Sequence, residues 1–187
     1  EYFRVGKYNE ALQYLKEALE IDKKLNNPYL LETRLNNIGA VYLRQGKYRE
    51  AEQVFLERKK LEDMIKPNRM FHPGLVEVYL LTGRYDDALK LAQELPPSWR
   101  DNTNRYIEYY TQVGLATKGK GLYKDSAEYF VKAINIIEET RKAVSNRTHF
   151  YIGGGYYSRL TPYRSIVYVL SNMNKKGDSL ISNLKQY

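Results

Sequence analysis

The sequence predicts an all-α solenoid in which antiparallel helix pairs stack on one another. The main support is a Gly-x-Tyr triplet that recurs at intervals of 37 to 40 residues and starts at Gly6, Gly46, Gly83 and Gly121. A fixed period of this length is typical of repeat arrays. Apolar residues between the triplets fall at helical spacing, as at Leu35, Ile38 and Val41. Each unit therefore reads as helix, glycine turn, helix, and units of this kind must stack because none can bury its own apolar face.

The repeat register divides the chain into four units and a different C-terminal part. We expect units at 1–27, 28–66, 67–100 and 101–144, an insert rich in aromatic residues and glycine at 145–161, and a degenerate fifth repeat or capping helices at 162–187. The first unit reads as a helix pair entered part-way, so we expect the chain to be an excerpt of a longer protein. Thr161 and Pro162 predict a helix start after the insert, with the threonine as N-cap.

Small residues recur where the two helices of a pair would cross. Gly39 and Gly114 occupy such positions in the first helices, and Phe55 and Phe130 follow in the second helices of the same units. A small residue lets two helices approach closely, and a large ring beside it fills the remaining space. We therefore expect close helix crossings at these small residues, with the Tyr and Phe positions filling the space beside them.

The segment LNNIGAVYLRQGKYREAEQVF (35–55) resembles the tetratricopeptide repeat (TPR). Leu35 takes the place of the family's tryptophan, and Ile38-Gly39 takes the place of its Leu-Gly pair; the other signature places hold Tyr42, Tyr48, Ala51 and Phe55. The resemblance covers residues 1 to about 144, in units longer than the usual ~34 residues, as in kinesin light chains and many bacterial signalling proteins. It implies a right-handed superhelix whose first helices line a concave groove.

Three places depart from the family pattern. Arg58 replaces a small residue late in a second helix, and Val76 replaces the glycine of the third unit. Pro96-Pro97 cuts the second helix of that unit short.

Composition excludes several kinds of site. The 187 residues include no Cys and only two His, which removes a disulfide framework, cysteine-based metal sites and a thiol nucleophile. No apolar run approaches the roughly 20 residues that span a bilayer. We expect no cofactor and no metal site.

One segment, GLATKGKG (114–121), nearly matches the phosphate-binding loop Gly-x4-Gly-Lys-Ser/Thr. It fails because Gly121 stands where a magnesium-binding hydroxyl is required and because no strand precedes it. The glycine run 153–155 likewise lacks the frame of a dinucleotide site. His72, before Pro73, is interpreted as a surface or helix-capping residue. Since no base–nucleophile pair remains, the sequence predicts no catalytic residues and no enzymatic activity.

The resemblance implies protein–protein interaction, with an extended peptide or a helix bound in the concave groove. In long TPR units an asparagine two residues before the glycine of the first helix commonly holds the ligand backbone, and Asn37 matches that place, with Gln112 as a longer amide in the fourth unit. The family's geometry implies further groove positions at Asn36, Ala40, Arg44, Glu77, Lys118, Arg164 and Tyr168.

Charge is concentrated at the C-terminal end. The net charge is +8, and residues 141–187 hold eight basic residues against one acidic residue. We single out a basic patch of Arg159, Arg164, Lys175 and Lys176. An acidic partner segment or a neighbouring domain of the same protein would suit this patch.

Three function classes follow from these observations. The first is a scaffold or adaptor, which we favour. The second is the sensory or regulatory region of a bacterial sensor kinase, transcription regulator or CHAT-type protease, since residues 133–150 loosely resemble the segment that precedes a CHAT domain. The third, an RNA-binding helical repeat, draws on the mixture of basic and aromatic residues, but no RNA-binding signature accompanies it and we do not expect nucleic acid as the partner.

Overall fold

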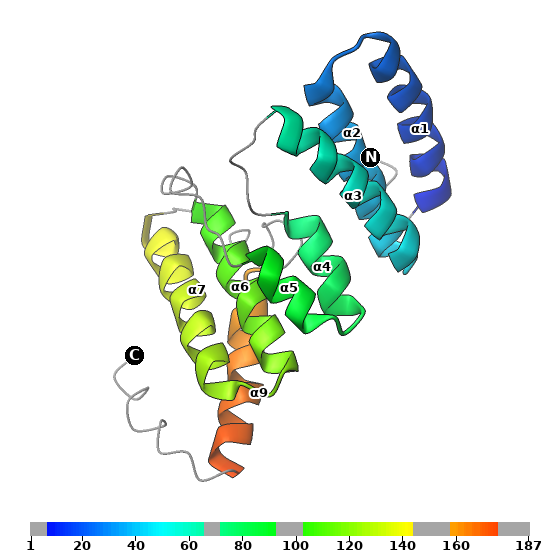
Figure 1. The fold of residues 1–187 in the computed structure, drawn as a ribbon. Coiled ribbons are helices and arrows are strands. Elements are labelled where there is room, and N and C mark those ends of the chain that lie inside the picture. Colours follow the sequence, from blue (N-terminus) through cyan, green and yellow to red (C-terminus); the bar gives the residue numbers. More distant parts are fainter. Residues whose placement is uncertain (1–6, 66–71, 93–102, 144–157, 176–187) are drawn as a thin grey trace.

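The computed structural model describes residues 7–65, 72–92, 103–143 and 158–175, which form α-helices and contain no strand (Figure 1). The helices are α1 (Tyr8–Lys24), α2 (Pro28–Arg44), α3 (Tyr48–Ile65), α4 (Pro73–Leu81), α5 (Tyr85–Ala92), α6 (Thr103–Gly119), α7 (Tyr123–Ala143) and α9 (Thr161–Lys175). None of these helices is both long and apolar enough to cross a membrane. Most of the predicted insert, Pro96-Pro97 and the helix expected after Gly177 lie outside the described residues.

The helices stack as a solenoid of pairs, which confirms the predicted fold class. α2 packs on α3, α4 on α5 and α6 on α7, and α1 packs on α2 as the second helix of a preceding pair (Figure 1). Each later first helix contacts both helices of the pair before it: α4 contacts α2 and α3, and α6 contacts α4 and α5. Because α9 contacts α6 and α7 in the same way, it takes the place of the first helix of a fifth pair.

The triplet glycines make the turns inside the pairs. Gly46, Gly83 and Gly121 have φ values of 71°, 74° and 76°, in the left-handed region that side chains disfavour. In each case the residue after the glycine donates its backbone N–H to a carbonyl of the preceding helix, as Lys47 does to Tyr42 at 3.0 Å. The glycine turn is thus the C-terminal cap of each first helix.

The two predicted crossings are present and leave no room for a side chain on the first helix. A Cβ atom added at Gly39 would lie 2.6 Å from the Phe55 ring, and one at Gly114 would lie 2.7 Å from the Phe130 ring. The third pair reverses the sizes, since the first helix carries Val76 and the second carries Ala92, both buried in one core cluster. The departure at Val76 is therefore matched by a small residue on the opposing helix.

A buried ionic network joins the second pair to the third. Arg58, only 6% exposed, donates from Nη2 to Glu32 at 2.8 Å and to Glu62 at 3.4 Å. Nδ1 of His72 lies 3.1 Å from the second carboxyl oxygen of Glu62, which is fully buried. The network thus contains groups from α2, α3 and the start of α4, and it accounts for a charged residue at a position where the family places a small one.

His72 corrects part of the sequence interpretation. It occupies the N-cap position of α4, as the capping alternative expected, but its side chain makes no capping hydrogen bond. The surface alternative is wrong, because only 3% of the residue is exposed. The imidazole is directed at Glu62 instead, since a buried carboxylate requires a polar partner.

The crossing of α2 and α3 provides a first prediction. Gly39→Val should destabilise the chain by about 1–3 kcal/mol through overpacking against Phe55, and Phe55→Ala by about 3–5 kcal/mol through the cavity it leaves. The double variant reproduces the valine–alanine arrangement of the third pair. Urea unfolding should therefore show it to be more stable than the sum of the single effects, by at least about 1 kcal/mol. Strict additivity would mean that the two positions do not pack on each other.

The ionic network provides a second prediction. Arg58→Met should lower the free energy of unfolding by about 3–5 kcal/mol, because it leaves the buried carboxylate of Glu62 and the half-buried carboxylate of Glu32 without the arginine. The matched control is Lys59→Met, which removes a neighbouring ion pair to the exposed Asp63 and should cost no more than about 0.5 kcal/mol. Equal urea midpoints for the two variants would contradict a stabilising role for the buried network.

Candidate functional site

The predicted groove residues all lie on one set of helices. α2, α4, α6 and α9 contact one another in succession, and we call them the first-helix layer. Asn36, Asn37, Ala40 and Arg44 belong to α2, Glu77 to α4, Gln112 and Lys118 to α6, and Arg164 and Tyr168 to α9. The repeat register therefore distributes these residues over four neighbouring helices, although they are far apart in the sequence.

Exposure separates these residues into groups. Asn37, Arg44, Arg164 and Tyr168 are exposed, whereas Asn36, Ala40 and Lys118 are half-buried. Glu77 and Gln112 are buried. The exposed group includes an amide, two guanidinium groups and an aromatic ring, which are the contact types that peptide recognition uses.

Glu77 is a carboxylic acid in an otherwise apolar helix. It is 8% exposed, and its Oε2 atom has no hydrogen-bond partner. Burial raises the pKa of Glu77 to about 8; the negative charge of Glu108 on α6 raises it further, and the positive charge of Arg44 on α2 opposes the rise. At neutral pH the carboxyl is therefore mostly protonated.

Gln112 connects two first helices. Its side chain is fully buried, and Nε2 donates to the carbonyl oxygen of Pro73 at 3.0 Å, which ties α6 to the first turn of α4. One of the two N–H donors of the amide is therefore used within the protein. Of the groups that could hold a ligand backbone, only Oε1 has no hydrogen-bond partner, so a ligand role for Gln112 depends on that atom alone.

The C-terminal end of the layer combines a cation with an aromatic ring. Nζ of Lys118 lies 5.2 Å from the ring centroid of Tyr168 on α9, and the same ring packs edge-on against Tyr123 with centroids 6.5 Å apart. Tyr168 is 52% exposed even so. Arg164 lies one helical turn before it and is also exposed.

The predicted basic patch is only partly described. Arg159 is half-buried and donates from Nη2 to Asn104 at 2.8 Å, and burial lowers its pKa. It therefore contacts the first turn of α6 and differs in that respect from the exposed Arg164. The side chain of Lys175 and the whole of Lys176 lie outside the described residues.

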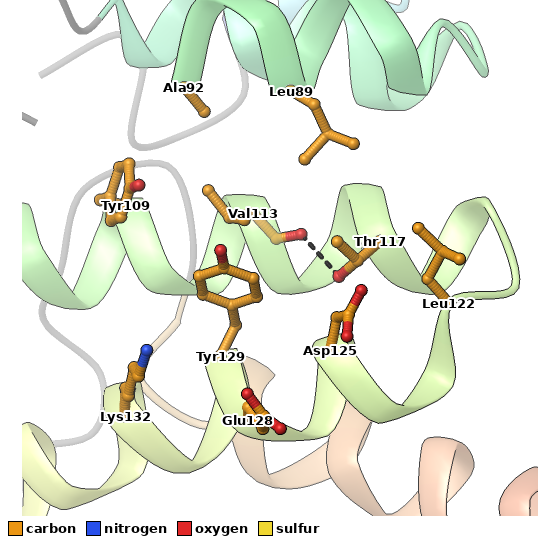
Figure 2. A pocket seen from close by; sticks show the side chains of 10 residues that line it. All are labelled: Leu89, Ala92, Tyr109, Val113, Thr117, Leu122, Asp125, Glu128, Tyr129 and Lys132. Carbon is orange, nitrogen blue, oxygen red and sulfur yellow. Dashed lines mark hydrogen bonds between the residues drawn. The ribbon is translucent and has the colours of Figure 1, made fainter. Parts of the chain in front are cut away.

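Sequence reasoning did not find a cavity of about 410 Å³ between α5, α6 and α7 (Figure 2). Its lining consists of Leu89, Ala92, Tyr109, Val113, Thr117, Leu122, Asp125, Glu128, Tyr129 and Lys132. One lining residue, Ala92, stands at the repeat position that Phe55 and Phe130 occupy in the second and fourth pairs. Burial raises the pKa of Tyr109 to about 12, with Tyr129 and Tyr110 adding to the effect.

The segment 114–121 does not form a phosphate loop. Residues 114–119 are the last turns of α6, and a Cβ at Gly119 would collide with the Tyr85 ring at 2.4 Å. Lys120 forms an ion pair with Asp86. Within the described part of the chain, no group of three or more acidic or histidine side chains is placed to hold a metal ion.

Comparison with known proteins agrees with this architecture. The family model "Tetratricopeptide repeat" matches residues 2–58. MamA 41-end from Desulfovibrio magneticus RS-1 has a similar structure, with a TM-score of 0.56, 23% identity, and coverage of 95% of this chain and 92% of that one. The RS-1 ArsTM double mutant of MamA gives a TM-score of 0.55 at 19% identity, with coverage of 93% and 91%. No curated protein matches the sequence significantly.

The structural likeness covers much more of the chain than the family match does. The family model reaches from the N-terminal end into α3, and the structural likeness extends the same helix-pair arrangement over the rest of the described helices. The recurring glycine turns and helix crossings belong to both parts. The family model therefore identifies residues 2–58 as tetratricopeptide repeat sequence, and the structural likeness shows that the chain as a whole has the fold of such repeats.

Proposed function

We propose that this chain is a protein–protein interaction module that binds an extended peptide or a helix of its partner on the first-helix layer. The observation that carries the proposal is that exposed polar and aromatic side chains recur on this layer, at Asn37 and Arg44 on α2 and at Arg164 and Tyr168 on α9. The tetratricopeptide repeat match at residues 2–58 and the solenoid fold support it, because repeats of this kind typically serve as non-enzymatic scaffolds.

The dimensions of the layer set the length of the bound segment. Packed helices lie about 8–10 Å apart, so four successive helices span roughly 24–30 Å. An extended chain rises about 3.3 Å per residue. A segment of about eight or nine residues would therefore reach from α2 to α9, and a library of random twelve-residue peptides is long enough to test the proposal.

Asn37 provides the third prediction. Asn37→Ala should weaken the affinity of peptides selected on the intact chain by ~1–2 kcal/mol, about 5- to 30-fold, through loss of hydrogen bonds to the ligand backbone. Because Asn37 is exposed, the melting temperature of the Asn37→Ala variant should equal that of the parent chain. Asn135→Ala, at an exposed position of the second helix α7, is the matched control and should leave affinity unaltered in calorimetric titration.

A different result would place the binding site at the basic C-terminal end instead. Binding that persists in Asn37→Ala but collapses when Arg159, Arg164, Lys175 and Lys176 are neutralised would assign recognition to the basic C-terminal end. The proposal for the full first-helix layer would then be wrong.

Tyr168 provides the fourth prediction. If the ligand continues to α9, Tyr168→Ala should lower affinity by about 1 kcal/mol or more, at least roughly fivefold, because exposed tyrosines often anchor interfaces. Val167→Ala is the control: Val167 is the preceding residue, is 67% exposed, and points to a different side of α9. Similar affinities for both variants in fluorescence anisotropy would limit the site to α2, α4 and α6.

A further inference from the structure

The contact between α4 and α6 contains two buried oxygen acceptors without a donor. Oε2 of Glu77 and Oε1 of Gln112 have no hydrogen-bond partner, and their residues are 8% and 0% exposed. Buried acceptors are normally satisfied, because leaving one unpaired costs about 1–3 kcal/mol. Two such atoms on facing helices therefore require an explanation.

Both acceptors belong to the same seam. Nε2 of Gln112 reaches the Pro73 carbonyl on α4, so Oε1 of the same amide group also lies between the two helices. Glu77 follows Pro73 by four residues and therefore lies on the same face of α4. Glu108 precedes Gln112 by four residues on α6, and its charge acts on Glu77. We call Glu77, Glu108 and Gln112 the acceptor seam.

The chemistry of the acceptor seam matches one class of ligand group. Once Glu77 is ionised, its carboxylate and Oε1 of Gln112 offer acceptors only, and one of the two amide N–H donors of Gln112 is already bound to Pro73. An arginine guanidinium or a lysine ammonium offers only donors together with a positive charge. We propose that the acceptor seam receives a basic side chain of the partner segment bound on the first-helix layer.

This inference rests on the proposed function and deepens it. It assigns the partner a basic residue opposite α4 and α6, whereas Lys118 and Arg164 would face a different part of the same segment. The bound segment would therefore carry a basic residue opposite the acceptor seam, between the exposed cations Arg44 on α2 and Arg164 on α9, and this charge pattern would fix its register across the layer.

Protonation of Glu77 gives the inference a distinctive readout. The charged groups that act on Glu77 are Glu108 on α6 and Arg44 on α2, and in the free chain its pKa is about 8. A carboxyl that accepts a cation must be ionised, so binding at pH 7 should release a proton. The affinity for an arginine-containing peptide should consequently rise between pH 6 and pH 8.5, while guanidinium itself stays charged throughout.

The test uses the intact chain and twelve-residue peptides selected on it. Each arginine of a selected peptide is replaced in turn by citrulline, which keeps the shape and removes the charge, and each lysine by norleucine. At one position the replacement should weaken binding to the parent chain about 10-fold or more. When the same peptide replacement is tested on the Glu77→Gln variant, the affinity for that variant should change by no more than about twofold.

Calorimetry in buffers of different ionisation enthalpy supplies the second measurement. The parent chain should release a proton on binding at pH 7, and Glu77→Gln should release none. Glutamine mimics the protonated carboxyl in shape and charge, so this variant should fold. Glu128→Gln, at an exposed position of α7, is the matched control and should keep both the arginine dependence and the proton release.

The possible failures are distinct. If no selected peptide binds with saturation, the proposed function is wrong and the inference falls with it. If peptides bind but tolerate citrulline and norleucine at every position, or bind Glu77→Gln as tightly as the parent, the proposed function stands and the acceptor seam is only a neutral contact between helices.

Discussion

The distance between the two helices of a pair determines how the next pair stacks on them. In the second and fourth pairs this distance is set by a ring pressed against bare backbone, Phe55 on Gly39 and Phe130 on Gly114. The third pair reaches a comparable fit with Val76 and Ala92. Since each first helix rests on both helices of the preceding pair, an error in one crossing would be passed to the next unit. Packing within pairs is thus the condition for an ordered first-helix layer.

Polar contacts supplement this packing between pairs. The Arg58 network joins α2 and α3 to the start of α4, and Gln112 joins α6 to the same end of α4. Apolar attraction has no direction of its own, whereas a hydrogen bond fixes the position of one particular donor relative to one particular acceptor. Both bonds involve residues next to each other in the chain, His72 and Pro73, so α4 is held from two sides at its first turn. This fixes where Glu77 lies within the layer.

The helix pairs, their turns and the glycine crossings could be predicted because they depend on local pattern. A turn with positive φ favours glycine, and the small residues at which two helices approach closely can be recognised from their spacing. The burial of His72, the donor of Gln112 and the partners of Arg58 depend on how successive units contact each other. A single sequence contains no direct measure of that stacking, so His72 was expected at the surface or at a cap. The cavity between α5, α6 and α7 could not be predicted for a similar reason, because its presence depends on how three helices pack and not on any single residue.

The short first helix of the third pair has a mechanical consequence. α4 has nine residues, whereas the first helices α2 and α6 have 17 each. In an array whose cohesion is a sum of nearest-neighbour terms, a shorter first helix contributes less contact area to its neighbours. Tension applied along the solenoid would therefore concentrate strain at its middle, and the flanking pairs would move as two stiffer arms. A segment bound across α2, α4, α6 and α9 would contact the units on both sides of α4 and would therefore stiffen the array at this point.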